Sequence, residues 1–112
     1  MFKVANLKEL SALNGFIAAI EFSDEGKLLQ KHGQIDDTRG NMVADLCSAN
    51  KRMGSMQAHG LSTFSDLKGL DEMNGFTISG PALSLCVYNS VSLFVENSQC
   101  DFNEVYRLLK KL

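Results

Sequence analysis

Residues 36–59 read DDTRGNMVADLCSANKRMGSMQAH, and this stretch predicts a long α-helix around which the rest of the chain is organised. Apolar side chains recur in it at three- and four-residue intervals, which places them along one face of a helix. They are Met42, Leu46, Ala49, Met53 and Met56. Val43 and Cys47 widen this face on one side, while the opposite side carries Asp45, Ser48, Lys51, Arg52 and Ser55. Such an amphipathic helix packs against a sheet or another helix.

The three methionines of this face allow two interpretations. Unbranched thioether side chains fill irregular gaps in a core, and they also suit adaptable contact surfaces. Burial in the protein's own core is the favoured interpretation, because apolar side chains on one helix face usually form the core. A surface for a partner is the alternative.

Length and composition limit what kind of protein this is. The 112 residues predict one domain, 1–112, and 11 Lys plus Arg against 13 Asp plus Glu give a net charge of −2. This charge does not resemble the basic footprint of a nucleic-acid-binding protein. The longest apolar run, 16–20, is too short to span a bilayer, and the N-terminus has no signal-peptide pattern. We expect a cytoplasmic protein without membrane insertion, whose three cysteines are free thiols.

The first third of the chain predicts a short helix and a hairpin. Asn6 and Glu9 have the spacing of a capping box, which predicts a helix from Asn6 to Leu13 with Leu7, Leu10 and Leu13 on its inner face. Asn14-Gly15 ends it. Residues 16–23 are apolar on both faces, as in a strand at mid-sheet, and residues 27–35 are more polar, as in an edge strand.

The remainder predicts three more strands and a final helix. We expect residues 60–74 to pack down through Leu61, Phe64, Leu67 and Leu70. Residues 75–79, 82–88 and 91–97 then form an antiparallel meander, because the links between them are too short for crossovers. A second capping box, Asp101 with Glu104, opens a helix. Its predicted inner face comprises Phe102, Val105, Tyr106, Leu109 and Leu112.

The element order is therefore α-β-β-α-β-β-β-α. It predicts an α+β fold, a five-stranded antiparallel sheet with helices on both faces. The strand with Phe76 and Ile78 would expose open backbone groups and apolar side chains if it lay at an edge of this sheet. Pairing with a second copy of the chain would cover it. The alternative is a monomer in which residues 60–74 shield that edge.

Nearly the whole chain resembles the roadblock/dynein-light-chain superfamily, whose fold is profilin-like. The residues that carry the resemblance are LKELSALNGFIAAIEFSDEGKLL, MVADLCSANKRM, NGFTISGPALSLCVYNSVSLFVEN and DFNEVYRLL. The chain looks most like a prokaryotic, uncharacterised branch of that superfamily. The resemblance implies a small non-enzymatic dimer that acts as a scaffold, a regulator of small GTPases or a motor-cargo adaptor.

The resemblance also implies how two copies pair. Superfamily dimers commonly pair their long helices and join their third strands, which here are residues 37–58 and 76–80. The implied homodimer interface comprises Met42, Leu46, Ala49, Met53, Met56, Phe76 and Ile78. Whether the partner chain is identical or only similar is left open.

No catalytic, cofactor-binding or metal site is predicted. Phosphate-binding glycine loops and the hydrolase and metalloprotease motifs are all missing from the sequence. We assign His32 and His59 to surface or packing roles, and the paired acids 24–25 and 36–37 to a turn and a helix start. Cys100 precedes a helix N-terminus, where the dipole can lower a thiol pKa, so it is a candidate reactive thiol.

Two hypotheses for the function follow. The first is a non-catalytic homodimeric module that scaffolds or regulates a protein partner, such as a small GTPase. The second is a sensor of a small molecule or of redox state, acting in the latter case through Cys100. An enzyme is disfavoured, because no pairing of a nucleophile with a base is evident.

Overall fold

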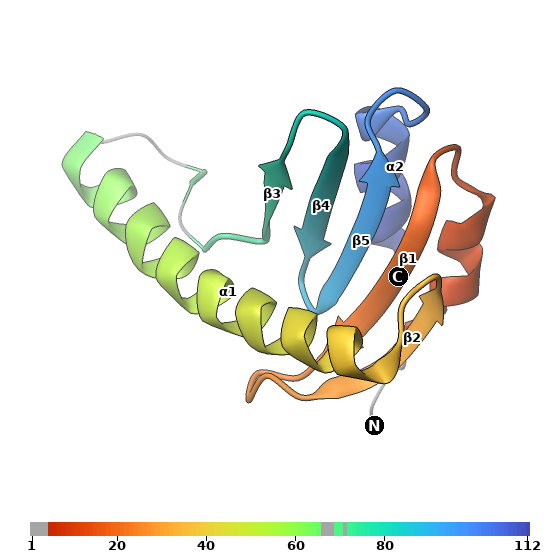
Figure 1. Cartoon of the computed structure of the whole chain (residues 1–112). Helices are drawn as coiled ribbons and strands as arrows, with labels where there is room; N and C mark the ends of the chain where they lie inside the picture. The colour runs from red at the N-terminus through yellow and green to blue at the C-terminus, as the bar shows by residue number, and fades with distance from the viewer. Residues whose placement is uncertain (1–4, 66–68, 71) are drawn as a thin grey trace.

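Five antiparallel strands form one sheet with helical segments on both faces (Figure 1), as the sequence predicts. The computed structural model describes residues 5–65, 69–70 and 72–112. In chain order the elements are η1 (Leu7–Ala12), β1 (Phe16–Phe22), β2 (Leu28–Gly33), α1 (Asp37–Ser65), β3 (Gly75–Ser79), β4 (Leu83–Tyr88), β5 (Val91–Glu96) and α2 (Phe102–Lys111).

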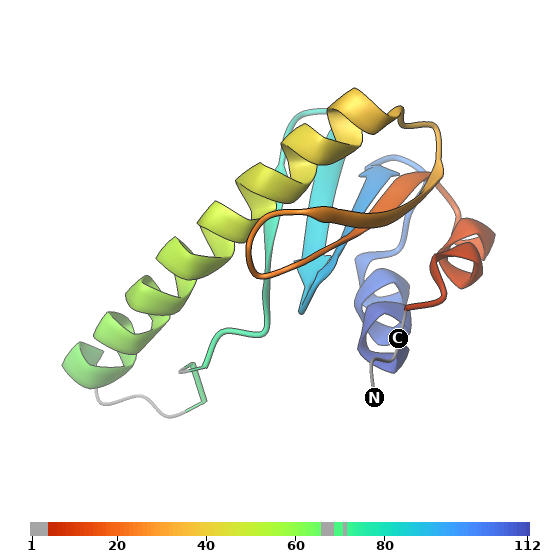
Figure 2. The same cartoon turned by 90° about the horizontal axis from the view of Figure 1, so that it is seen from below.

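The strand order across the sheet is β2-β1-β5-β4-β3. Strands β3, β4 and β5 form the predicted meander, and the central strand β5 then pairs with β1 on its other side. The two edge strands are β2 and β3, which confirms the predicted positions of β1 inside the sheet and β2 at its edge. Because α1 carries the chain from one edge to the other, it crosses one face of the sheet diagonally (Figure 2).

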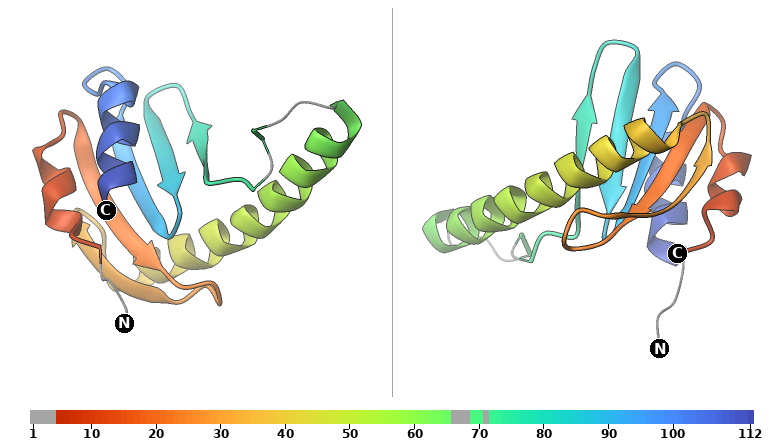
Figure 3. Two further views of the ribbon diagram at one scale, coloured as in Figure 1. Left: turned by 180° about the vertical axis from the view of Figure 1, so that it is seen from behind. Right: turned by 60° about the horizontal axis from the view of Figure 1, so that its bottom comes forward.

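Each face of the sheet has its own core, and alternation along the strands divides the side chains between them. One core lies between the sheet and η1 with α2, and its buried members include Leu7, Leu10, Leu93, Val95, Val105 and Leu109. The other core lies under α1 and comprises Ile20, Phe22, Val43, Ala44, Cys47 and Val87. Figure 3 shows η1 and α2 together on the face away from α1.

The first helical segment differs from the prediction in type and in its cap. It is a 3₁₀-helix whose Asn6 makes no side-chain cap to the backbone. The Asn6 Nδ2 donates instead to Glu9 Oε1 at 3.3 Å, so the two capping groups bind each other. The predicted burial of Leu7 and Leu10 is nevertheless confirmed. Gly15 has φ +81°, and a Cβ there would lie 2.9 Å from the Glu96 carbonyl oxygen, so this turn requires glycine.

The long helix extends beyond its predicted end near His59 and continues to Ser65. The segment after Gly60 therefore begins as helix rather than as packed loop. Leu61 and Leu70 are 56% and 43% exposed, so the prediction that they are packed down is wrong. The side chain of Phe64 and the whole of Leu67 lie outside the described residues. Within the described part of the chain, no helix is long and apolar enough to cross a membrane.

Half of the predicted capping box on α2 is present. The Asp101 side chain accepts a hydrogen bond from the Asn103 backbone N–H at 2.9 Å. Glu104 does not reach back to the cap and instead binds the Arg107 guanidinium at 2.6 Å, which lowers the pKa of the Glu104 carboxyl. Val105 and Leu109 are buried as predicted, whereas Phe102 is 37% exposed and does not belong to the inner face.

Candidate interaction surface

The apolar face of α1 points away from the sheet. We call Met42, Leu46, Ala49, Met53 and Met56 the methionine stripe. Met42, Leu46, Met53 and Met56 are 56%, 58%, 58% and 76% exposed, so the favoured interpretation of these residues as core is wrong. Ala49 is half-buried. Intervals of four, three, four and three residues separate the members of the stripe, which is the spacing of a helix–helix seam.

Smaller residues make the contact with the sheet instead. Val43, Ala44, Cys47 and Ser48 are buried, although Ser48 was predicted on the solvent side. Its hydroxyl donates to the Asp24 carbonyl at 2.9 Å and thereby ties the helix to the β1–β2 turn. The large side chains of this core come from the strands, so a helix face of small residues brings α1 close to the sheet.

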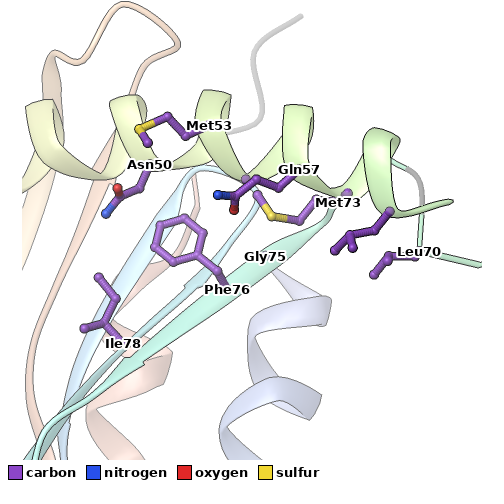
Figure 4. Close-up of a pocket in the computed structure, with 11 residues that line it drawn as sticks. Asn50, Met53, Gln57, Leu70, Met73, Gly75, Phe76 and Ile78 are labelled. Atoms are coloured by element: carbon purple, nitrogen blue, oxygen red, sulfur yellow. The ribbon is translucent and has the colours of Figure 1, made fainter. Parts of the chain in front are cut away.

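A groove runs along one flank of the methionine stripe, between the second half of α1 and β3 (Figure 4). Its volume is about 480 Å³. Phe76 and Ile78 extend from β3 on one side, and Asn50 and Gln57 extend from α1 toward them on the other, with Met53 lying along the helix (Figure 4). Met73 closes one end against the helix at Gly54, where a Cβ would lie 2.6 Å from its sulfur. The groove is largely apolar, since Asn50 and Gln57 have the only polar side chains among the described residues that line it. It is open to solvent at Ile78, which is 50% exposed.

The outer edge of β3 has no neighbouring strand among the described residues. Asn89 N–H donates to the Asn74 carbonyl, and Gly80 N–H donates to the Leu83 carbonyl. In an antiparallel pair, hydrogen-bonded positions alternate, so the even-numbered residues of β3 bond to β4. Gly75, Thr77 and Ser79 consequently turn their backbone N–H and C=O groups outward. This row of groups can accept another strand.

A tyrosine of α2 holds β3 in place from the other face of the sheet. The Tyr106 hydroxyl donates to the Phe76 carbonyl at 3.2 Å and is hydrogen-bonded to the Thr77 hydroxyl. Partial burial raises the pKa of the Tyr106 phenol. Helical periodicity predicts Tyr106 on the inner face of α2 but does not predict this contact. Nothing in the spacing of residues predicts which strand a helix side chain will reach.

The described residues show no arrangement that resembles a catalytic or metal site. None of the described His, Cys, Asp and Glu residues gather in a group able to hold a metal ion. His32 lies against the Phe16 ring, with ring centroids 6.0 Å apart. Cys47 and Cys86 are buried, and this burial raises their pKa. Cys100 is half-buried and free, so its role as a reactive thiol stays a prediction.

A family model covers residues 6–111, and its description is "Uncharacterized conserved protein (DUF2173)". The chain belongs to this family. Curated proteins give no match to the chain.

Solved structures show which fold this family shares. The chain is 15% identical to a structure described as "MglB with tetrameric arrangement", with a TM-score of 0.75 and coverage of 94% of this chain and 77% of that one. It is 16% identical to the gliding protein MglB of Thermus thermophilus, with a TM-score of 0.67 over 94% of this chain and 78% of that one. For a Roadblock/LC7 domain from Streptomyces avermitilis, the TM-score is 0.65 at 15% identity, over 83% of this chain and 77% of that one.

At such low identity these likenesses establish the fold and nothing more specific. The DUF2173 chain has the roadblock fold that the sequence predicts, and the family to which it belongs is an uncharacterised one. The predicted interface stays a prediction. Met53, Phe76 and Ile78 line the groove between α1 and β3, whereas Met42, Leu46 and Met56 are exposed on α1 outside its lining.

Proposed function

We propose that this DUF2173 protein is a non-catalytic homodimeric module that regulates or scaffolds another protein. The observation that carries the proposal is the exposure of the methionine stripe, whose four large side chains are each more than half accessible. Apolar surface that is continuous along a helix and adjoins an open strand edge usually marks a protein interface. A second copy of the chain supplies a matching surface, because a twofold axis pairs a patch with itself.

The chemistry of the two sheet edges favours β3 as the pairing edge. Strand β2 carries Lys31, whose Nζ lies 3.5 Å from an Asp37 oxygen and 3.0 Å from the Ile35 carbonyl. An irregularity in register between Glu21 and Phe22 also distorts the pairing of β1 with β2. Lysines and bulges are features that protect an edge from further pairing. Strand β3 has neither and presents Phe76 and Ile78 beside an apolar groove.

The outward backbone groups of β3 suggest a register for the dimer. A twofold axis through Thr77 would place this residue opposite itself and pair Gly75 with Ser79 of the second copy. Phe76 would then face Ile78 of the second copy on the side of the sheet that carries the groove. This register uses all three outward-facing residues of the strand.

The proposed identity of the regulated partner rests on the resemblance to the roadblock superfamily, not on the geometry of this chain. The roadblock superfamily includes regulators of small GTPases, and the chain has the roadblock fold. A small GTPase is therefore the partner we propose to test first. A homodimer presents two equivalent copies of any docking surface, which suits a scaffold or regulator.

Disulfide trapping tests the dimer and its register together. The variant Thr77→Cys in a Cys100→Ser background would cross-link two copies under mild oxidation, because a directly opposed, hydrogen-bonded pair lies about 5.5 Å apart between Cα atoms, which is within disulfide range. Leu29→Cys on strand β2 is the matched control and would stay uncross-linked. A wild-type chain that sediments as a monomer, with equal trapping at both positions, would refute the dimer.

A sensor of small molecules is the second candidate, and the groove is the observation that favours it. Its volume of about 480 Å³ lies within the usual range for ligand pockets, and both apolar side chains and two amides line it. A thermal-shift screen against metabolites tests this function. A saturable rise in melting temperature that Phe76→Ala abolishes, without loss of the dimer, would favour the sensor.

A further inference from the structure

A second hollow lies on the other flank of the methionine stripe, where α1 passes the β1–β2 turn. Its volume is about 430 Å³. The exposed Met56 gives it an apolar wall above the buried Phe22, and Ser48 and Ser55 add hydroxyl groups. We call it the turn hollow. It differs from the α1–β3 groove in its charged lining, which comprises Lys51, Arg52 and Asp24.

Both cations of the turn hollow are only weakly satisfied within the protomer. Lys51 Nζ lies 4.0 Å from an Asp24 carboxylate oxygen, and the Asp24 side chain is 92% exposed. The Arg52 guanidinium reaches the Asp24 carbonyl at 3.5 Å, the limit of a hydrogen bond. That carbonyl already accepts the Ser48 hydroxyl at 2.9 Å. Weak exposed contacts of this kind contribute little to stability, so both cations remain available to a ligand.

The helix around these cations is free of opposing charge. Residues 46–65 contain Lys51, Arg52 and His59 but neither Asp nor Glu. On the β1–β2 turn, the Asp24 carboxylate lines the hollow, and Asp45 Oδ1 on α1 lies beside Gly26 of the same turn. Complementing the helix dipole does not explain the two cations, because they lie in the middle of α1 and its last turn holds no basic residue.

We propose that the turn hollow binds an acidic segment of a partner protein in which an apolar side chain lies beside carboxylates. The apolar side chain would lie against Met56, which is 76% exposed, above the buried Phe22, and the carboxylates would pair with Lys51 and Arg52. Arg52 is suited to this pairing because its guanidinium can hold a carboxylate by two parallel hydrogen bonds. The inference rests on the proposed function, since it names the chemistry of the regulated partner. It requires the second copy to cover the methionine stripe only as far as Met53, so that Met56 stays available to the segment.

An anionic membrane is a weaker fit to the same residues. Helices that lie on membranes combine a broad apolar face with a polar face rich in Lys and Arg. Here two cations adjoin a walled hollow that also contains the Asp24 carboxylate. A hollow with apolar walls suits one inserted side chain, whereas a flat lipid surface would leave it unfilled.

NMR titration of the ¹⁵N-labelled protein tests this inference. The probe is a synthetic peptide of Asp and Glu residues that flank a single Phe, and a second peptide replaces the acids with Lys. We expect the acidic peptide to shift the amide signals of residues 48–56 and the basic peptide to leave them unchanged. Lys51→Glu with Arg52→Glu would weaken this binding by about tenfold or more. The matched control is Lys110→Glu with Lys111→Glu, which makes the same charge change on the exposed end of α2.

Three outcomes would overturn the inference. The first is that the acidic peptide shifts no amide signals at residues 48–56. The second is that the two double variants weaken peptide binding equally. The third is that the protein binds phosphatidylserine vesicles through Lys51 and Arg52 but does not bind the peptide. Sedimentation of the same samples separates this inference from the proposed function. A Lys51→Glu, Arg52→Glu variant that remains dimeric but loses the peptide supports the inference. A wild-type monomer that still binds the peptide contradicts only the dimer.

Discussion

Replacing Leu46 by alanine measures what the methionine stripe contributes to association. Leu46 is 58% exposed in the protomer, and full burial of a leucine side chain is worth about 1.5–3 kcal/mol. Burying the exposed part contributes about 1–1.5 kcal/mol for each copy, or roughly 2–3 kcal/mol in a twofold dimer. At about 1.4 kcal/mol per factor of ten, Leu46→Ala would raise the dimer dissociation constant by roughly 30- to 150-fold.

Sedimentation equilibrium across a range of concentrations measures this constant. Leu29→Ala is the matched control, because Leu29 is 51% exposed on the opposite edge strand β2 and loses the same atoms. Alanine is the strongest helix former, so Leu46→Ala should not unfold α1, and circular dichroism checks this. An unchanged dissociation constant for Leu46→Ala, or an equal increase for Leu29→Ala, would refute the assignment of the stripe to the interface.

Three further predictions concern the contacts that hold β3, α2 and the two cores in place. Tyr106→Phe removes the hydrogen bonds to Thr77 and Phe76 and should lower the unfolding free energy by about 1 kcal/mol, with faster hydrogen exchange confined to β3 and its neighbours. Asp101→Ala removes the cap of α2 and should cost about 1 kcal/mol in urea unfolding, whereas Glu104→Gln should cost clearly less because Glu104 does not cap. Burial raises the pKa of the Cys47 and Cys86 thiols. The stability that these neutral thiols contribute is therefore complete below the pKa of an unfolded thiol and is lost as the pH rises above about 8.5. Replacing both cysteines by alanine should flatten this alkaline decline in the unfolding free energy, as measured by urea unfolding across the pH range.

The sequence predicted the sheet well because its strands are short and strongly patterned. Leu85 and Val87 face α1, while Val91, Leu93 and Val95 face α2, as alternation along the strands requires. Turn residues between them left no room for a crossover, which fixed the meander. The polar residues along β2 predicted an edge strand, and the apolar residues on both faces of β1 predicted a strand inside the sheet.

The orientation of α1 could not be obtained in this way. Two sets of residues on this helix have helical periodicity, the large set of the methionine stripe and the small set that includes Ala44 and Cys47. A helix pattern reveals a stripe but does not say what lies beneath it. The strands already supply Ile20 and Phe22 to the core under α1, so little volume is left for methionines there. The face of α1 that packs on the sheet depends on the volume left by side chains from distant segments, and helical periodicity carries no information about that volume.

The capping errors have a related cause. Asn6 with Glu9 and Asp101 with Glu104 have the same spacing, yet only Asp101 caps its helix. Glu104 has Arg107 as a neighbour one turn away, and an ion pair with it competes with the backbone. Spacing identifies the residues able to cap, whereas nearby charges determine which of them do so.

The far half of α1 extends beyond the sheet (Figure 1), and Ala58 is the one buried residue among 52–63. Little of the protomer supports this half, so if the proposed dimer forms, the helical content of this half should rise as subunits associate and fall on dilution. The abundance of the chain in its cell would then set both how many dimers exist and how much of each chain resists proteolysis. The folding of this half of α1 would thereby depend on the concentration of the chain.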